Sequence, residues 1–407
     1  MSRVVLGVAG GIAAYKACEL LRRLRAADHD VRVVPTESAL QFVGAAIWAA
    51  LSGHPVSTSV WDDVHQVPHV KIGQEADLVV VAPATADLLA RAASGRADDL
   101  LTNVLLTARC PVVFAPAMHT EMWQHPATRA NVAALRGHGA VVVDPDSGRL
   151  TGADSGPGRL PEPAELFAVA ATILARPAAA AQCAAQDLAG LRVVVSAGGT
   201  REHLDPVRFL GNASSGLMGY ALARAAVLRG AAVHLVTANV TLPAPAGAEV
   251  ELVVSTADLE QAMNRAAKDA DLVVMAAAPA DFTPAATSDT KLKKQGDHGL
   301  DMTFVQTPDV LAGLVAARTD PAQVLVGFAA ETPTQEQGLV DLGRAKLARK
   351  GCDLLVLNPV GHGRAFGRPD NEITLITEAS EVGPITGSKD VLAHDIWDAA
   401  LALRSRR

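Results

Sequence analysis

Short apolar runs, most of them rich in valine, alternate with Ala- and Leu-rich helical patterns and form two successive series along the chain. Runs without polar alternation are typical of strands buried on both faces, as in a parallel sheet covered by helices. The pattern predicts an α/β protein with two Rossmann-like, doubly wound parallel-sheet domains in tandem. The predicted strands are Val4–Val8, Val31–Val34, Leu78–Ala82, Val112–Ala115 and Val141–Val143, followed by Val193–Ser196, Val233–Thr237, Leu272–Ala276, Val324–Gly327 and Leu354–Asn358.

Two stretches of the first series have close counterparts in the second. VVLGVAGG, which begins at Val4, is echoed by LRVVVSAGGT from Leu191, and ADLVVVAPATAD from Ala76 is echoed by ADLVVMAAAPAD from Ala270. A chain of 407 residues is also longer than one hydrophobic core usually serves. We expect domains at residues 1–175 and 191–407, joined at residues 176–190 by a linker or frayed helix end, because this segment is poor in large apolar side chains.

The composition is that of a globular protein that binds small molecules. Hydrophobic residues make up 49% of the chain and charged residues 19%, and the formal net charge of −7 without a long basic run argues against nucleic-acid binding. The four cysteines are scattered without CxxC spacing, so neither a disulfide framework nor a zinc site is expected. The N-terminal run is broken by glycines, unlike a signal peptide, and no apolar run resembles a membrane span. We therefore expect a cytoplasmic protein without nucleic-acid or membrane partners.

The turn after the first predicted strand carries Gly10 and Gly11, at the edge where open parallel sheets bind their ligands. Free N–H groups at the start of the following helix suit a phosphate. The turn lacks the GxGxxG pattern, so a mononucleotide such as a flavin fits better than a dinucleotide. A plain tight turn between strand and helix is the alternative.

Other strand ends of the first half carry hydroxyl or polar groups that should converge on one crevice. These ends are PTESA from Pro35, APATAD from Ala82 and APAMHTEMW from Ala115. His69 lies shortly before the third strand, where an imidazole could act as a base, although a lone histidine is more often structural.

In the second half, Ser214, Ser215 and Gly216 precede an Ala-rich helix. Such a loop offers N–H and hydroxyl groups to an anion, and an ordinary helix cap at Asn212 or Ser214 is the alternative.

Two further clusters of the second half carry charged groups. PADFTPAATSDTKLKK places Asp281 beyond a strand, where an acid can hold Mg²⁺, and Lys291 on the following loop, where a lysine can neutralise a triphosphate. A solvated charged loop is the alternative reading of this run. Lys346 and Lys350 have helical i,i+4 spacing on a face that meets either solvent or a nucleotide.

The ordered set of motifs is more specific than any one of them. GGIAAYK, PTESA, His69, ADLVVVAPATADLLAR, PAMHTEMW and DSGPGRLPEP together resemble the flavin-dependent cysteine decarboxylase family. With the second half included, nearly the whole chain resembles the bifunctional phosphopantothenoylcysteine decarboxylase/phosphopantothenate–cysteine ligase family of bacterial coenzyme A synthesis.

The resemblance implies FMN in the first half. It places the FMN phosphate and ring at Gly10, Gly11, Ile12, Thr36, Ser38, Ala82, Pro83, Ala84 and Thr85. In the implied reaction the cysteinyl thiol of the substrate is oxidised to a thioaldehyde with His69 as base, the carboxylate leaves as CO₂, and the resulting ene-thiol is reduced. The cofactor supplies the redox chemistry, with no net redox change.

The chain departs from the family pattern at two positions. Related enzymes commonly carry Asn in a PAMN motif that contacts the substrate carboxylate, where this chain has His119. They also commonly carry Cys in an ACGD flap as the proton donor of the final reduction, where TGAD places Gly152. Glycine cannot donate that proton, so another acid, a bound water or a rearranged flap must act, or the product stays an unsaturated thiol. His119 is one candidate acid, and the alternative is that it only orients the substrate.

For the second half the resemblance implies a ligase that activates the carboxylate of 4′-phosphopantothenate with CTP and Mg²⁺. Pyrophosphate leaves, and the amine of cysteine then attacks the acyl-cytidylate. Asn212 should stabilise the acyl-cytidylate, with Lys291 as a catalytic cation and Asp281 as the metal ligand. Leu217 stands where related chains often have Lys. The residues expected around substrate and CTP are Arg208, Ser214, Ser215, Gly216, Met275, Ala276, Ala277, Asp281, Lys291, Thr307, Pro308, Asp309, Val310, Phe328, Lys346 and Lys350.

The resemblance also implies assembly, with trimeric decarboxylase contacts and dimeric ligase contacts in a homo-oligomer as large as a dodecamer. The partners implied are therefore 4′-phosphopantothenate, cysteine, CTP and further copies of the chain. One alternative is an active ligase fused to a flavin-binding scaffold or regulatory half. A nicotinamide dehydrogenase is a second alternative, against which the missing GxGxxG counts.

Overall fold

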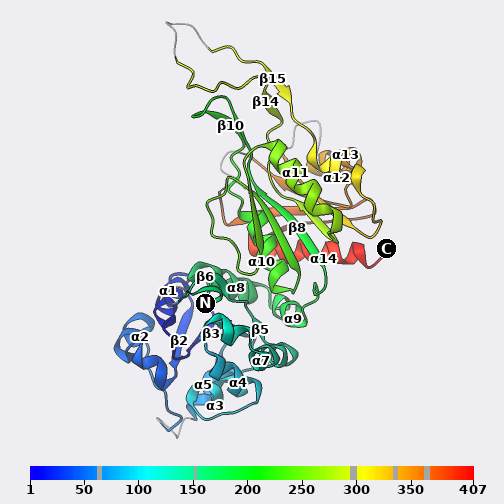
Figure 1. The fold of residues 1–407 in the computed structure, drawn as a ribbon. Helices are drawn as coiled ribbons and strands as arrows, with labels where there is room; N and C mark the ends of the chain where they lie inside the picture. Colours follow the sequence, from blue (N-terminus) through cyan, green and yellow to red (C-terminus); the bar gives the residue numbers. More distant parts are fainter. Residues whose placement is uncertain (62–66, 151–153, 294–299, 333–337, 362–366) are drawn as a thin grey trace. The chain divides into compact units, whose positions relative to one another are not determined.

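The computed structural model describes residues 1–61, 67–150, 154–293, 300–332, 338–361 and 367–407. The chain divides into two compact units, one formed by Met1–Asp187 with Leu228–Gly230 and the other by Leu188–Val227 with Ala231–Arg407 (Figure 1). Each unit holds one main sheet with helices on both faces, which confirms the predicted α/β class with two parallel-sheet domains.

The first sheet has the order β2-β1-β3-β4-β5, and all its strands are parallel. Its central strands are almost entirely buried, as the unbroken apolar runs predicted. A short antiparallel pair, β6 and β7, follows the sheet. The bounds are β1 Arg3–Val8, β2 Asp30–Pro35, β3 Leu78–Ala84, β4 Val112–Pro116, β5 Val141–Val142, β6 Asp146–Arg149 and β7 Ser155–Arg159.

Helices cover both faces of the first sheet. One face packs against α1 (Ala14–Ala26), α2 (Ala45–Ser52), α8 (Pro163–Ala175) and α9 (Ala178–Ala185). The other face packs against α3 (Pro68–Glu75), α4 (Ala86–Ala93), α5 (Leu100–Thr107) and α7 (Pro126–Gly137), with the short helix α6 (Thr120–Gln124) beside them. A 3-10 turn, η1 (Glu37–Gln41), follows β2.

The segment expected to be a linker contains the helix α9. Ala179, Ala180 and Cys183 of this helix are buried, and Ala180 and Cys183 belong to the core of the first unit. Small side chains let a helix approach its neighbours closely, so a stretch without large apolar residues can still pack. No single helix among the described residues is long and apolar enough to cross a membrane; only the pair α8 and α9, bent by 119°, passes that test together.

The second sheet has the order β12-β11-β8-β13-β16-β17-β18-β19. It is parallel from β12 to β17, whereas β18 and β19 extend it in antiparallel fashion. The bounds are β8 Arg192–Gly198, β11 Ala232–Ala238, β12 Glu249–Val253, β13 Leu272–Met275, β16 Val324–Glu331, β17 Leu354–Pro359, β18 Asp370–Ile376 and β19 Glu381–Ser388.

Helices α10 (Leu217–Leu228) and α14 (Lys389–Arg404) cover one face of this sheet, where Trp397 is fully buried and its Nε1 donates to the carbonyl of Leu222. Helices α11 (Thr256–Ala266), α12 (Val310–Ala317) and α13 (Leu339–Lys350) cover the other face, with a 3-10 turn, η3 (Ala267–Asp269).

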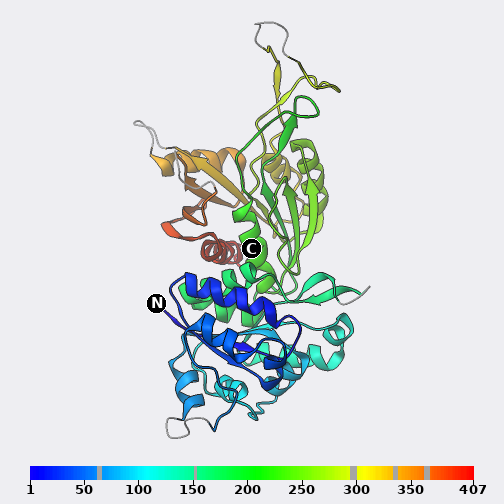
Figure 2. The ribbon, with the colours of Figure 1, turned by 90° about the vertical axis from the view of Figure 1, so that its left-hand side faces the viewer.

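Two small antiparallel pairs lie side by side beyond the carboxyl edge of the second sheet (Figure 2). They are β9 (Arg201–His203) with β10 (Phe209–Gly211), and β14 (Phe282–Pro284) with β15 (Phe304–Gln306). The parallel strands bring their following loops to this same edge, which is where the candidate site of the second unit lies.

Candidate functional site

In the first unit, the glycine turn after β1 meets the turn after β2 at very short range. A Cβ atom built on Gly10 would lie 2.5 Å from both Cβ and Oγ of Ser38, so no side chain fits there without a shift. Gly11 faces the third strand, because a Cβ atom on it would lie 3.6 Å from Cγ2 of Thr85. The turns after β1, β2 and β3 therefore form one cradle, in which only glycine lets the backbone come close.

Hydroxyl groups line this cradle. Oγ1 of Thr36 caps the 3-10 turn η1 by accepting from the N–H of Ala39, and it lies 3.2 Å from Oγ of Ser38. Thr85 caps α4, where its Oγ1 accepts from the N–H of Leu88. The residue that follows β1 is hydrogen-bonded to β3, because the N–H of Ala9 donates to the carbonyl of Pro83. These are groups that suit the phosphate and the polar edge of a flavin.

His69 lies near the start of α3 and is half-buried. Its backbone carbonyl accepts from Oγ1 of Thr107, which anchors α3 on α5. Its Nδ1 atom is buried and has no hydrogen-bond partner among the described residues. A buried ring nitrogen without a partner is uncommon, and it suits a group that meets a ligand. No described hydrogen bond or ion pair joins His69 to the glycine cradle or to His119.

His119 follows β4 and precedes the short helix α6. The pair β6–β7 packs on this segment: the N–H of Met118 donates to the carbonyl of Gly158, and a Cβ on Gly158 would lie 2.2 Å from the carbonyl oxygen of Met118. Nδ1 of His119 lies 3.8 Å from Oδ2 of Asp154. Gly152 lies outside the described residues.

All four cysteine thiols of the chain have a raised pKa. Burial raises the pKa of the Cys183 thiol to about 12 and that of Cys352 to about 11, and it also raises the pKa of Cys18 and Cys110. The thiolate is the nucleophilic form of cysteine, so a raised pKa makes a thiol a weaker nucleophile near neutral pH. None of the four cysteines occupies the flap position, which is Gly152 in this sequence.

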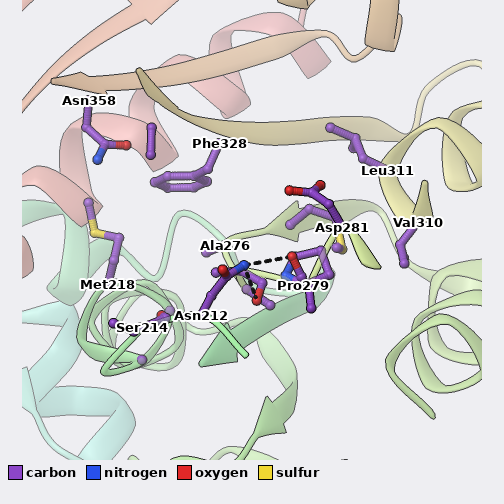
Figure 3. A pocket seen from close by; sticks show the side chains of 18 of the residues that line it. Asn212, Ser214, Met218, Ala276, Pro279, Asp281, Val310, Leu311, Phe328 and Asn358 are labelled. Carbon is purple, nitrogen blue, oxygen red and sulfur yellow. Dashed lines mark hydrogen bonds between the residues drawn. The ribbon is translucent and has the colours of Figure 1, made fainter. Parts of the chain in front are cut away.

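The second unit holds a pocket of about 740 Å³ at the carboxyl edge of its sheet (Figure 3). Most residues predicted around substrate and CTP line it: Asn212, Ser214, Ser215, Gly216, Met275, Ala276, Ala277, Asp281, Thr307, Pro308, Asp309, Val310, Phe328, Lys346 and Lys350. Loops far apart in the sequence thus converge, as expected for the ends of parallel strands.

Asn212 links two of the pocket's loops. Its Nδ2 donates to the carbonyls of Ala278, at 3.3 Å, and Pro279, at 2.8 Å (Figure 3). The backbone of Asn212 also lies close to Gly199, because a Cβ on Gly199 would lie 2.6 Å from the carbonyl oxygen of Asn212. The amide is held at the mouth of the pocket, with its Oδ1 left to accept a hydrogen bond.

Glycines bring the start of α10 close to the sheet. Gly216 has φ +78°, a conformation that other residues rarely adopt, and a Cβ on it would lie 2.6 Å from Val240. A Cβ on Gly219 would lie 2.5 Å from Cβ of Ala197 on β8. The N-terminal N–H groups of α10 therefore open directly onto the pocket, where they suit a phosphate.

The pocket's two predicted lysines are already paired with carboxylates. Nζ of Lys346 lies 2.8 Å from Oε1 of Glu331, and Lys350 forms an ion pair with Asp309. Burial opposes ionisation of Asp309, but hydrogen bonds from Lys350 and from the N–H of Ala312 outweigh it and lower the Asp309 pKa. Both lysines are thus held in place at the pocket wall.

Asp281 has an exposed side chain, and its backbone carbonyl accepts from the N–H of Thr307. Among the residues that the structure describes, no group of three or more His, Cys, Asp or Glu side chains could hold a metal ion.

Arg208 and Lys291 are not among the residues that line the pocket, and Arg208 binds Asp205 instead. Asp205, whose side chain is fully buried, accepts from the backbone N–H groups of Val207, Arg208 and Leu292 and from Nε of Arg208. Although burial opposes ionisation, these hydrogen bonds lower the pKa of Asp205 to about 2. Asp205 thus holds Arg208 and the backbone of Leu292 together. Since Leu292 follows Lys291 directly, these hydrogen bonds also fix the loop that carries Lys291.

Known families and proteins match nearly the whole chain. The family described as Flavoprotein matches residues 1–174, and the family described as DNA/pantothenate metabolism flavoprotein C-terminal domain matches residues 188–403. The coenzyme A biosynthesis bifunctional protein CoaBC of Mycolicibacterium smegmatis is 56% identical over 98% of this chain and 97% of its own length. The chain belongs to the CoaBC family.

Other CoaBC proteins match over a similar extent. The one from Mycobacterium tuberculosis (strain H37Rv) is 56% identical over 98% of this chain and 96% of its own length. The one from Escherichia coli (strain K12) is 40% identical over 97% of this chain and 96% of its own length. The predicted function is confirmed: the chain is a bifunctional enzyme of coenzyme A biosynthesis that combines a ligase with a flavoprotein decarboxylase.

Sequence reasoning missed one end of the pocket of this CoaBC family member. Asn358, Asn371 and Lys389 line it, yet none was among the predicted residues. Asn358 ends a predicted strand, which was a usable signal. Asn371 and Lys389 follow no buried apolar run, so their sequence neighbourhood gave no sign of a site.

Proposed function

We propose that residues 191–407 carry out the first of two steps, the CTP-dependent ligation of cysteine to 4′-phosphopantothenate, and that residues 1–175 then decarboxylate the product to 4′-phosphopantetheine. The observation that carries the ligase assignment is the convergence of Asn212, the Ser214–Gly216 loop, Asp281 and Lys346 on one pocket. The glycine cradle with its hydroxyl groups supports the decarboxylase assignment.

In the ligase step, the carboxylate of 4′-phosphopantothenate attacks the α-phosphate of CTP and pyrophosphate leaves. Carboxylate oxygen is a poor leaving group, and the mixed anhydride replaces it with CMP. The amine of cysteine then attacks the acyl carbon and displaces CMP. Asn212 lies at the pocket mouth, where its amide can hydrogen-bond the acyl-cytidylate. The start of α10 and Lys346 stabilise the negative charge of the phosphates.

We further propose that one Mg²⁺ accompanies the CTP phosphates and is held by Asp281. The exposed carboxylate of Asp281 faces the pocket, whereas Asp309 is already engaged with Lys350. A single carboxylate with phosphate oxygens and water is a common magnesium environment.

For the decarboxylase step we propose that the flavin is FMN. Gly10–Ile12 with Thr36 and Ser38 would hold its phosphate, and Ala82–Thr85 would lie along its ring. Bound there, the flavin supplies reversible two-electron oxidation. His69 takes the proton of the substrate thiol, a role that the unpartnered buried Nδ1 supports.

We propose that His119 delivers the proton of the final reduction. The described residues of β6 and β7 offer hydroxyl, guanidinium and carboxylate groups, none of which is a good proton donor near neutral pH. His119 lies under this pair of strands and beside Asp154, which can orient the imidazole.

Three variants of the full chain test these assignments by where the reaction stops. Asn212→Ala should abolish formation of phosphopantothenoylcysteine, His69→Gln should let that compound accumulate, and His119→Asn should let the ene-thiol accumulate. Product mass spectrometry distinguishes the three compounds. A His119→Asn enzyme that still gives only saturated product would contradict the assignment of His119, and a normal product yield from either other variant would contradict its own assignment.

The proposal includes assembly into a homo-oligomer in the cytoplasm. Exposed apolar side chains gather on the small strand pairs of the second unit: Phe209 is 45% exposed, Phe282 47% and Val305 47%. Exposed apolar patches of this kind commonly mark protein interfaces.

A further inference from the structure

The loop that follows β13 positions two groups of the candidate ligase site. Residues 276–281 line the pocket, and Asp281, the proposed magnesium ligand, lies at the end of this loop. The carbonyls of Ala278 and Pro279 accept from Nδ2 of Asn212 (Figure 3). The loop belongs to no helix or strand, so contacts from outside it must fix the places of Asp281 and Asn212.

Buried hydroxyl groups from β8 and from the turn after it hold this loop. Oγ of Ser196 accepts from the N–H of Ala277 at 3.0 Å, and Oγ1 of Thr200 accepts from the N–H of Ala280 at 2.8 Å. Both Ser196 and Thr200 are fully buried. Neither is among the residues that line the pocket, so they can act on a ligand only through the loop.

Thr200 is itself held by a buried carboxylate. Its Oγ1 lies 3.0 Å from Oγ1 of Thr256, and the hydroxyl of Thr256 donates to Oε1 of Glu202 at 2.9 Å. The N–H of Thr256, the first residue of α11, donates to the same oxygen at 2.9 Å. Glu202 is 5% exposed, and Thr256 is fully buried. A carboxylate at the start of a helix is stabilised by the free N–H groups and by the helix dipole.

The carboxylate gives this chain of hydrogen bonds one direction. A carboxylate only accepts, so the hydroxyl proton of Thr256 points to Glu202, and its oxygen accepts from the hydroxyl of Thr200. The oxygen of Thr200 then accepts from the N–H of Ala280. A second acceptor for Thr256, the carbonyl of Ala280, is more distant, at 3.5 Å. Hydrogen bonds in such a chain polarise and strengthen one another.

The other side of Ala280 is fixed as well. Its carbonyl accepts from Oγ1 of Thr307 at 2.6 Å, and the carbonyl of Asp281 accepts from the N–H of Thr307. Ala280 is only 4% exposed. Its N–H would therefore be left without water or a protein partner if the hydroxyl of Thr200 were removed, and the loop would have to move to satisfy it.

We propose that Thr200 is a positioning residue of the ligase reaction, held in place by Glu202 through Thr256. It fixes the loop on which the places of Asp281 and Asn212 depend. Displacement of such groups by about 1 Å is enough to slow a reaction strongly. This inference rests on the proposed ligase function.

The test compares Thr200→Val, which removes the hydroxyl at nearly constant shape, with Thr200→Ser, which keeps it. Thr237→Val is the matched control, because Thr237 is also fully buried and its hydroxyl lies 3.4 Å from that of Tyr220, away from the residues that line the pocket. In the full-length enzyme, kcat and KM of ligation are measured at several Mg²⁺ concentrations. Decarboxylation of supplied phosphopantothenoylcysteine is measured on the same preparations.

Thr200→Val should lower kcat/KM of ligation about 10- to 100-fold and raise the Mg²⁺ concentration that gives half the maximal rate, because Asp281 is displaced. Thr200→Ser and Thr237→Val should stay within about threefold of the parent. Decarboxylation should be unchanged in all three variants. Parent-like ligation by Thr200→Val, an equal loss in Thr237→Val or in decarboxylation, or no rescue by serine would overturn the proposal.

Glu202→Gln tests the chain that holds Thr200, and it keeps the test open if Thr200→Val does not fold. It removes the charge and keeps an acceptor oxygen, so it should lower ligation by a smaller factor. The double variant should ligate no more slowly than Thr200→Val alone, because the two residues act through one chain. Parent-like ligation by Glu202→Gln, or effects that multiply in the double variant, would contradict this chain.

Amide hydrogen exchange in residues 276–281 separates the positioning role from the proposed function. The amide of Ala280 should exchange faster in Thr200→Val and in Glu202→Gln than in the parent, whereas Thr200→Ser should match the parent. Unchanged exchange would overturn the role of Thr200 whether or not the enzyme turns over. Failure of the parent enzyme to ligate would instead contradict the proposed function, on which hydrogen exchange does not depend.

Discussion

At the scale of single residues, glycines decide how closely the turns of both units approach their neighbours. Gly10 meets Ser38, Gly199 meets Asn212, and Gly219 meets β8, in each case at distances that leave no room for a Cβ atom. The Rossmann-like turns are thus fixed by the absence of a side chain, and the groups beside them, Ser38 and Asn212, are the ones we assign to ligands.

Gly10→Ala should impair the flavin site. The new Cβ would lie 2.5 Å from Ser38, so the turn must shift, and overpacking of this kind costs about 1–3 kcal/mol of unfolding free energy. We expect a large loss of bound flavin, measured by visible absorbance of the purified protein. Gly137→Ala, where a Cβ meets nothing within 4 Å, is the matched control and should keep its flavin. Full flavin occupancy in Gly10→Ala would contradict the assigned cradle.

Some of the residues that the resemblance named belong to or adjoin buried apolar strands, among them Thr85, Met275 and Phe328. For these residues the apolar pattern also indicates a place at the carboxyl edge of a sheet. Lys389 and Asn371 lie at that edge only because β18 and β19 reverse direction, and β19 is mostly exposed and shows no apolar run. Chain reversal is a non-local property that periodicity cannot reveal.

At the scale of elements, the loop that carries Lys291 depends on one buried carboxylate. Asp205 joins Arg208 to Leu292, across segments far apart in the sequence. The family resemblance implied that Arg208 and Lys291 lie around the substrate and CTP, but a motif match cannot show which side chains hold them in place. In the structure Arg208 and the backbone N–H of Leu292 bind Asp205, and neither Arg208 nor Lys291 is among the residues that line the pocket.

Asp205→Asn should loosen this loop and lower ligase kcat/KM by about 10- to 100-fold, as expected when a catalytic group is misplaced. The Asp205 pKa of about 2 is below that of an unfolded chain, so its stabilising effect is present above about pH 4 and is lost as the pH falls towards 2.

The urea midpoint should therefore be lower for Asp205→Asn than for the parent at pH 7, and the gap should be smaller at pH 3. Asp289→Asn, an exposed acid on the same loop, is the control and should match the parent at both pH values. A gap that stays constant down to pH 3 would argue against an ionised, hydrogen-bonded Asp205.

At the scale of the whole molecule, the proposal makes each unit a complete chemical module on the same type of sheet. Both use the carboxyl ends of parallel strands, and both place a glycine turn before the first helix. The sequence predicted this repeated architecture because buried parallel strands leave continuous apolar runs. It did not reveal α9, since a helix of small residues resembles a linker in composition.

Assembly should depend on the small strand pairs of the second unit. Light scattering should give the parent a mass of at least two chains, and Val305→Glu should lower that mass, because a charge on an apolar interface costs desolvation. Leu252→Glu, at an exposed apolar position on the edge strand β12, is the control. A monomeric parent, or an unchanged mass for Val305→Glu, would contradict assembly through this surface.

The most direct test of the account is mass spectrometry of the products formed when the purified full chain receives 4′-phosphopantothenate, cysteine, CTP and Mg²⁺. We predict saturated 4′-phosphopantetheine together with CMP, pyrophosphate and CO₂. Accumulation of phosphopantothenoylcysteine in flavin-loaded protein would contradict the decarboxylase assignment. Absence of any CTP-dependent cysteine adduct would contradict the ligase assignment, on which the order of the two steps depends.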